Sequence, residues 1–151
     1  MYRFLLLGMF FPMFSYSQDV YFISVENPPQ YIGGSTAMYQ FIGKNFKYPQ
    51  ELDTIKKNYF GAVEIKISEN GNNEGVRLVG SPIDCKSCNE EALRIGRLLT
   101  DWQAGKQNGK PVKCLFIVPI MVSYEKKCIY TTEPYAVKGW RGAGKEVYHC
   151  N

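Results

Sequence analysis

Cysteine is the residue type in this 151-residue sequence with the widest choice of chemistry, and there are five cysteines. Cys85 and Cys88 form a C-x-x-C pair directly before a helix-like segment, where a helix N-terminus lowers the pKa of a thiol. Redox pairs with this spacing follow a strand within a β-α-β unit, however, and no such unit is visible upstream. We therefore interpret the pair as a structural disulfide or as inert thiols, with thiol–disulfide activity as the alternative.

An odd number of cysteines leaves at least one thiol without a partner in the chain. We predict that this thiol is Cys114, because a helix over residues 89–102 is about 21 Å long and separates it from Cys85 and Cys88. A disulfide tolerates only about 7 Å between its Cα atoms. The disulfide candidates, whose connectivity stays open, are Cys85, Cys88, Cys128 and Cys150.

Other catalytic or metal-binding patterns are weak. The single histidine, His149, lies near the C-terminal end, so a nucleophile–histidine dyad has little support. A zinc site built from Cys85, Cys88, His149 and Cys150 has suitable ligand types, but nothing in the spacing beyond the C-x-x-C supports it. The glycine-rich residues 139–144 are not followed by the Lys-Ser/Thr of a phosphate-binding loop. We expect no enzyme activity, no cofactor and no metal.

The composition is that of one globular domain. Hydrophobic residues make up 45% of the chain, and 18 Lys+Arg against 14 Asp+Glu leave a net charge of +4. A small net charge with this apolar fraction excludes a disordered chain. The absence of basic runs also argues against nucleic acid as the main partner.

The first 17 residues resemble a secretory signal peptide. Arg3 is their only charge, an apolar run follows over residues 4–14, and Ser15-Tyr16-Ser17 offers a small-x-small cleavage pattern before Gln18. A membrane anchor is the alternative, but a stable span needs about 20 apolar residues. We predict an exported, periplasmic protein that begins at or near Gln18 after cleavage.

The elements that must position these residues follow from hydrophobic periodicity. A helix opened by Ser35 or Thr36 and ended by Pro49 precedes two strands of a hairpin, over residues 60–68 and 75–80. The second helix covers residues 89–102, and a third strand covers residues 112–124. This order predicts an α+β fold, a three-stranded antiparallel sheet with both helices on one face. We expect an entry segment at residues 18–29, a domain at residues 30–124, and an irregular, cysteine-bearing tail at residues 125–151.

The third strand contains Pro119, which cannot donate a hydrogen bond to a neighbouring strand. Prolines of this kind are found on edge strands or at bulges, so we expect the third strand to lie at the edge of the sheet. An uncovered edge presents backbone groups with which an extended peptide can pair.

Several motifs together resemble the TonB C-terminal domain family, in the form of short exported proteins of Bacteroidetes type. The resemblance comprises Lys47-Tyr48-Pro49, the hairpin at residues 61–80, the helix start Asn89-Glu90-Glu91-Ala92-Leu93-Arg94, and Trp102 with residues 105–112. Residues 29–34 and 118–120 complete the series. Ala104 stands where the family usually has proline.

The resemblance implies a periplasmic protein-binding module of energy-coupled transport. In the family, the partner is an outer-membrane TonB-dependent transporter, whose short N-terminal segment pairs with an exposed strand. We expect an accessory module without its own motor anchor or stable membrane span, and a homodimer is left open. The expected contact residues are Val112, Lys113, Cys114, Leu115, Phe116, Ile117, Val118, Pro119, Ile120 and Met121.

Overall fold

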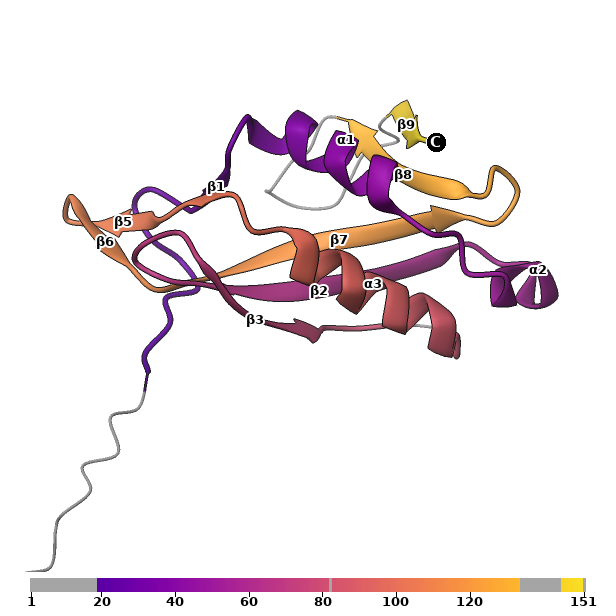
Figure 1. Cartoon of the computed structure of the whole chain (residues 1–151), viewed down its shortest axis with the longest axis horizontal. Helices are drawn as coiled ribbons and strands as arrows, with labels where there is room; N and C mark the ends of the chain where they lie inside the picture. The colour runs from indigo at the N-terminus through magenta and orange to yellow at the C-terminus, as the bar shows by residue number, and fades with distance from the viewer. Residues whose placement is uncertain (1–18, 82, 134–144, 151) are drawn as a thin grey trace, which may run out of the picture.

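A computed structural model describes residues 19–81, 83–133 and 145–150 of the chain (Figure 1). Its helices are α1 (Gly34–Asn45), α2 (Glu51–Ile55) and α3 (Lys86–Leu98). Its strands are β1 (Gln30–Tyr31), β2 (Tyr59–Ile67), β3 (Asn73–Leu78), β4 (Trp102–Gln103), β5 (Gly105–Gln107), β6 (Lys110–Val112), β7 (Cys114–Ser123), β8 (Cys128–Glu133) and β9 (Lys145–His149).

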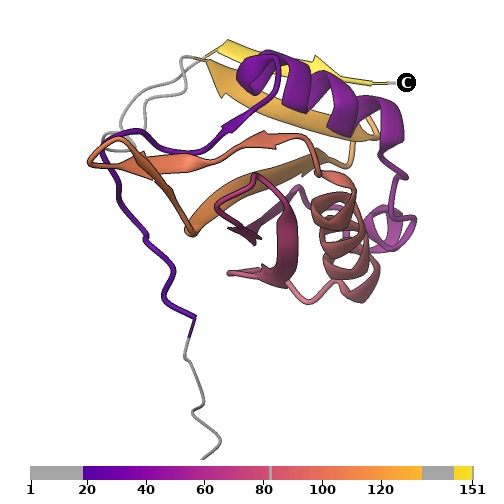
Figure 2. The ribbon, with the colours of Figure 1, turned by 60° about the vertical axis from the view of Figure 1, so that its left-hand side comes forward.

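The main sheet of the described residues has the strand order β3-β2-β7-β8-β9, and every neighbouring pair is antiparallel. Helix α3 contacts β2 and β3 at one end of this sheet, and α1 contacts β8 and β9 at the other end (Figure 2). The buried side chains of α1 and α3 form one core cluster with those of the strands, which shows that the two helices cover the same face. The short pairs β1–β4 and β5–β6 lie apart from the main sheet.

The alternation of apolar and polar side chains over residues 63–67 of β2 determines which face of the sheet packs against the helices. Val63, Ile65 and Ile67 are fully buried on the face that carries the helices. Phe60 and Lys66 point to the opposite face, which we call the open face, and both are exposed. The sequence prediction of a half-buried strand is therefore confirmed for β2.

Helix α3 packs closely on the β2–β3 hairpin. Ala92, Ile95 and Leu99 are fully buried on its inner face. A Cβ atom built on Gly96 would lie 2.7 Å from a methyl carbon of Val76, so the helix backbone approaches β3 as only glycine permits. The helix begins and ends earlier than the predicted 89–102, because Cys85 is its N-cap and the chain leaves the helix after Leu98.

A buried carboxylate joins the end of α1 to α3. Glu91 of α3 accepts a hydrogen bond of 2.7 Å from the backbone N–H of Lys47 and forms an ion pair with Arg94. The guanidinium of Arg94 in turn donates to the backbone carbonyl of Asn45 at 2.6 Å. These bonds hold the turn that leads from α1 to α2.

The α+β class is correct, but the expected three-stranded sheet with two helices is wrong in detail. The described ranges contain a third short helix, α2, and two further strands, β8 and β9, which extend the sheet. Both strands belong to the tail that was expected to be irregular. β8 begins with Cys128-Ile129-Tyr130-Thr131-Thr132, which is rich in β-branched and aromatic residues that favour a strand. The glycine-rich sequence after β8 suggested an irregular tail, but β8 pairs with both β7 and β9.

The predicted signal peptide, residues 1–17, lies outside the described residues. Within the described ranges, no helix is both long enough and apolar enough to cross a membrane.

Candidate functional site

The residues expected to bind a partner lie almost entirely on β7. Val112 ends β6, Lys113 links the two strands, and the others belong to β7. β7 pairs with β2 along its whole length, from Ile67↔Cys114 to Tyr59↔Val122, and lies between β2 and β8 in the sheet. The expectation that this is the outermost strand of the sheet is therefore wrong, because the tail adds β8 and β9 beyond it.

The other side of β7 has neighbours only at its two ends. Near the start, Phe22 pairs with Cys114 in a short parallel bridge. At the end, Met121–Ser123 pair with residues 128–130 of β8, whereas residues 131–133 of β8 pair with β9 and not with β7. In the part of the chain that the structure describes, residues 116–120 have no neighbouring strand on this side. We call this stretch the β7 gap.

Pro119 lies in the β7 gap, and the direction of the backbone explains why proline is tolerated there. The carbonyl of Lys113 and the N–H of Leu115 bond to Phe22, so odd-numbered residues of β7 direct their backbone groups away from β2. Pro119 has the same orientation, and its missing N–H costs no bond to β2. Its carbonyl accepts a hydrogen bond from the Tyr39 hydroxyl of α1 at 3.4 Å.

The β7 gap borders an apolar groove on the open face of the sheet. The groove has a volume of about 570 Å³. Ile117 is 55% exposed and Phe60 is 44% exposed, and both side chains line the groove. The lining residues are Phe60, Gly61, Ala62, Val79, Gly80, Ser81, Ile117, Pro119 and Met121. By contrast, the even-numbered residues Cys114, Val118 and Ile120 are buried on the helix-covered face.

An ion pair between a buried carboxylate and a mostly exposed guanidinium lies beside the groove on the same face. Glu64 of β2 accepts hydrogen bonds from Arg77 of β3 at 2.5 and 2.8 Å. The bond from Arg77 holds the pKa of the Glu64 carboxyl below its usual value. Glu64 is also opposite Ile117 in the strand register, so the pair fixes one end of the apolar surface.

All five cysteines lie within the described residues, and four of them form disulfides. Cys85 pairs with Cys88, and Cys128 pairs with Cys150. Cys114 is free and buried, which confirms the prediction for this residue, and burial raises the pKa of its thiol. Because the disulfides use every cysteine of the zinc alternative, that arrangement of ligands is not present.

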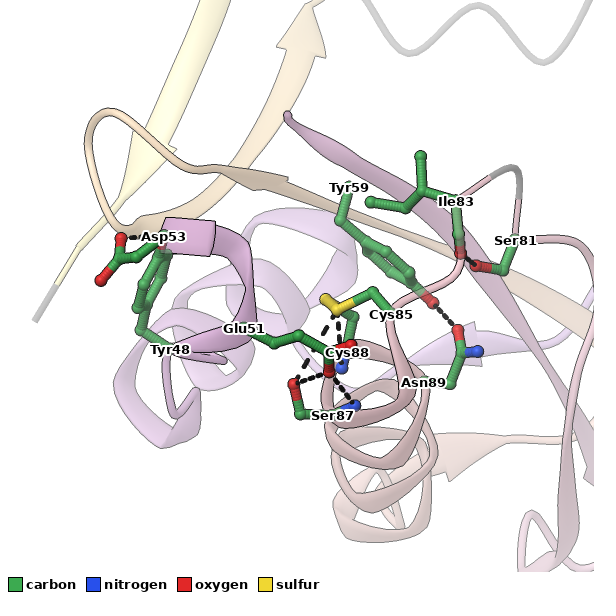
Figure 3. Close-up of a disulfide and its surroundings, with 10 residues drawn as sticks. All are labelled: Tyr48, Glu51, Asp53, Tyr59, Ser81, Ile83, Cys85, Ser87, Cys88 and Asn89. Carbon is green, nitrogen blue, oxygen red and sulfur yellow. Dashed lines mark hydrogen bonds between the residues drawn. A yellow bond between two sulfur atoms is a disulfide. The ribbon is translucent and has the colours of Figure 1, made fainter. Parts of the chain in front are cut away.

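The C-x-x-C disulfide is part of the helix cap rather than an exposed reactive pair. Both cysteines are buried, and the Cys85 sulfur accepts a hydrogen bond from the backbone N–H of Cys88 at the first turn of α3 (Figure 3). Glu51 of α2 accepts bonds from the backbone N–H and hydroxyl of Ser87, at 2.9 and 2.7 Å. These bonds lower the pKa of the Glu51 carboxyl. Thiol exchange with another protein would first require this helix start to open.

Sequence reasoning missed the β2 side of the groove and the role of the entry segment. A signal for the β2 side was present, because Phe60 shares its face of β2 with Ala62, Glu64 and Lys66 and is the one large apolar side chain among these four. The contact between residue 22 and β7 leaves no comparable signal, because it depends on backbone groups far apart in the sequence.

A family model described as Gram-negative bacterial TonB protein C-terminal matches residues 44–122, which is more than half of the chain. This range begins in α1 and ends in β7. No curated protein matches the chain. No solved structure matches it either. The chain belongs to the TonB C-terminal domain family, whose members are periplasmic, non-enzymatic protein-interaction modules that bind outer-membrane transporters.

Proposed function

We propose that this protein is a periplasmic binding module that engages the N-terminal segment of an outer-membrane transporter by strand addition to β7. The observation that carries the proposal is the β7 gap beside the apolar groove. The contact region is that of residues 112–121, with direct backbone pairing concentrated at residues 116–120. Membership of the TonB C-terminal domain family supports the proposed role in energy-coupled transport.

The backbone of Ile117 is the main point of attachment in this proposal. Its N–H and C=O are directed away from β2, as the bonds of Lys113 and Leu115 show for the same set of residues. An extended peptide placed in the β7 gap satisfies both groups. Pro119 offers no donor, and Tyr39 already contacts its carbonyl, so pairing ends near this residue.

The side chains of such a peptide alternate between the two faces of the sheet. Those on the open face lie next to Ile117 and can bury apolar surface against the β7 side of the groove. A net contribution of about 0.5–1.5 kcal/mol per backbone hydrogen bond gives a weak and reversible complex. This suits a module whose contact with a transporter has to release.

Replacement of Ile117 by proline tests the proposal. Ile117→Pro removes the N–H that faces the β7 gap and leaves the backbone groups that bond β2 in place, so the fold is retained. Ile117→Ala is the matched control, because it shortens the side chain but keeps the N–H. The measurement is the capture of synthetic peptides with the N-terminal sequences of outer-membrane transporters by the full chain.

We expect Ile117→Pro to abolish capture and Ile117→Ala to weaken it only a few-fold. Circular dichroism establishes that both variants are folded. Undiminished capture by a folded Ile117→Pro variant would show that β7 is not the binding strand.

A further inference from the structure

The chain's own N-terminal segment already pairs with the side of β7 that faces away from β2, next to the β7 gap. The backbone N–H of Phe22 donates to the carbonyl of Lys113 at 2.8 Å, and the N–H of Leu115 donates to the carbonyl of Phe22 at 2.9 Å. Phe22 thus lies beside Cys114 as a parallel strand neighbour. A second bridge, between Asn27 and Lys106, holds the segment further along. We call residues 19–23 the entry strand.

Polar side chains add to the attachment of the entry strand. Asp19 forms an ion pair of 2.8 Å with Lys113, and the Tyr21 hydroxyl donates to Glu74 at 2.6 Å. The ammonium groups of Lys66 and Lys113 lie 5.2 and 5.6 Å from the centre of the Tyr21 ring. The contacts come from β2, from β3 and from the start of β7, so the segment is recognised by three neighbouring elements.

The entry strand is nevertheless not part of the hydrophobic core. Val20 is 70% exposed, Ile23 is 82% exposed, and Phe22 is 40% exposed. Val20 and Ile23 therefore contribute little apolar burial, and the attachment depends mainly on backbone bonds, an ion pair and cation–π contacts near solvent. Interactions of this kind are individually weak and are screened by salt. Such a segment can leave without disturbing the sheet beneath it.

We propose that the entry strand is an internal competitor for the side of β7 that faces away from β2. A partner segment must displace it in order to pair with β7 from Lys113 onwards. This inference rests on the proposed function, since it concerns the same edge. A partner that starts at Lys113 can continue in the parallel direction into the β7 gap, where the entry strand does not reach. It therefore gains the backbone bonds of Ile117 in addition to those that it replaces.

The resident contacts also indicate the chemistry of the competing segment. It is extended and runs parallel to β7, with a carboxylate placed for Lys113 and an aromatic ring between Lys113 and Lys66, as Asp19 and Tyr21 provide now. A segment that displaces the entry strand but lacks the carboxylate loses the ion pair with Lys113 that Asp19 forms now. The entry strand therefore favours the binding of partners that reproduce its contacts.

Phe22→Pro in the full chain tests the competition. Proline removes the N–H that bonds Lys113, and the expected result is release of the entry strand and faster hydrogen exchange of the Leu115 amide. Ile23→Pro is the matched control: it makes the same substitution one residue later, at a position whose N–H forms none of the bonds to β7. The probe is a labelled synthetic peptide with the sequence of residues 18–26, added to each protein.

We expect the probe peptide to bind Phe22→Pro about tenfold more tightly than the wild-type chain or Ile23→Pro, because removal of a competing closed state raises the fraction able to bind. Equal binding to all three proteins, or binding to none, would overturn the inference. Faster Leu115 exchange without tighter peptide binding would overturn it as well.

Transporter peptides separate this inference from the proposed function. Capture of the probe peptide by Phe22→Pro, with no transporter peptide bound by any variant, supports the internal competitor and refutes transporter binding. Equally tight binding of transporter peptides to the wild-type chain and to Phe22→Pro, lost in Ile117→Pro, supports transporter binding and refutes the competitor.

Discussion

At the scale of single residues, Gly71 connects the β2–β3 hairpin to β4. Its φ of +80° favours glycine, and a Cβ atom there would clash with the backbone carbonyl oxygen of Trp102. We expect Gly71→Ala to destabilise the fold by about 2–4 kcal/mol, because left-handed strain adds to overpacking against a backbone atom. Gly109→Ala is the control, since Gly109 has a φ of +72° but open space around it.

Gly109→Ala should cost only about 1 kcal/mol, from the backbone conformation alone. Urea unfolding of both variants measures the difference. Equal destabilisation by the two substitutions would mean that the contact between the hairpin and Trp102 does not constrain the fold.

The Glu64–Arg77 pair predicts a pH dependence of stability. The pKa of Glu64 is lowered in the folded protein by Arg77, so the stabilisation is present above the unfolded pKa of about 4.3 and is lost as the pH falls through the lower folded value. We expect Glu64→Gln to be less stable by about 1 kcal/mol at pH 7, because the Arg77 side of the pair is solvated. The deficit should shrink between about pH 5 and pH 3.

Glu69→Gln makes the same change of charge at an exposed position and serves as the control. Thermal or urea unfolding over this pH range provides the measurement. A deficit for Glu64→Gln that is constant down to pH 3 would contradict the role assigned to the pair.

The cysteines predict a simple thiol count. Cys114 is buried, burial raises the pKa of its thiol, and the other four cysteines are in disulfides. We expect no rapid reaction with a thiol reagent in the native protein and one thiol per chain after unfolding without reductant. A rapidly reacting pair of thiols in the native protein after mild reduction would revive thiol–disulfide exchange at Cys85 and Cys88.

At the scale of elements, the Cys128–Cys150 disulfide holds the added strands of the tail. It joins residues 22 positions apart, whereas Cys85 and Cys88 are only three apart. Because a longer loop loses more entropy when it is closed, we expect the double variant Cys128→Ser/Cys150→Ser to lose about 2–4 kcal/mol and Cys85→Ser/Cys88→Ser to lose less from this source.

Hydrogen exchange locates the effect of the first double variant. Protection should fall in β8 and β9 and persist in β2 and β7, because the β2–β7 pairing is independent of the tail. A uniform loss of protection over the whole sheet would show that the tail strands are required for the domain core.

The core elements could be predicted from the sequence because each has a local pattern. Val63, Ile65 and Ile67 alternate with polar residues, and Ala92, Ile95 and Leu99 recur at helical spacing. β8 has no such alternation over enough residues, and its pairing partner β9 lies beyond a glycine-rich stretch. The interior position of β7 follows from that long-range pairing, so Pro119 alone suggested an edge strand.

The sequence indicated β7 as the candidate binding strand but did not indicate the extent of the site. Pro119 marked a place where one side of β7 lacks a strand neighbour, and the sequence could show nothing more specific. The extent of the β7 gap depends on where the pairing of β8 with β7 ends, and the pairing of Lys113 and Leu115 depends on Phe22. Both are contacts between distant segments, which composition and periodicity do not encode.

At the scale of the whole molecule, the sheet of the described residues offers three places for an added strand. Its two outermost strands are β3 and β9, and the β7 gap lies in the interior between two helix-covered halves. The β7 gap differs from the outer edges because it borders the apolar groove and ends at Pro119. We therefore propose that a partner binds at this gap rather than at β3 or β9.

Residue-resolved hydrogen exchange of the full chain, with and without a transporter N-terminal peptide, tests this assignment most directly. Bound peptide should slow exchange of the Ile117 amide, whose N–H faces the β7 gap, and should leave the even-numbered amides of β7 unchanged because they already bond β2. The Leu115 amide should remain protected as the peptide takes the place of Phe22. New protection confined to β3 or β9, with Ile117 unchanged, would contradict the account.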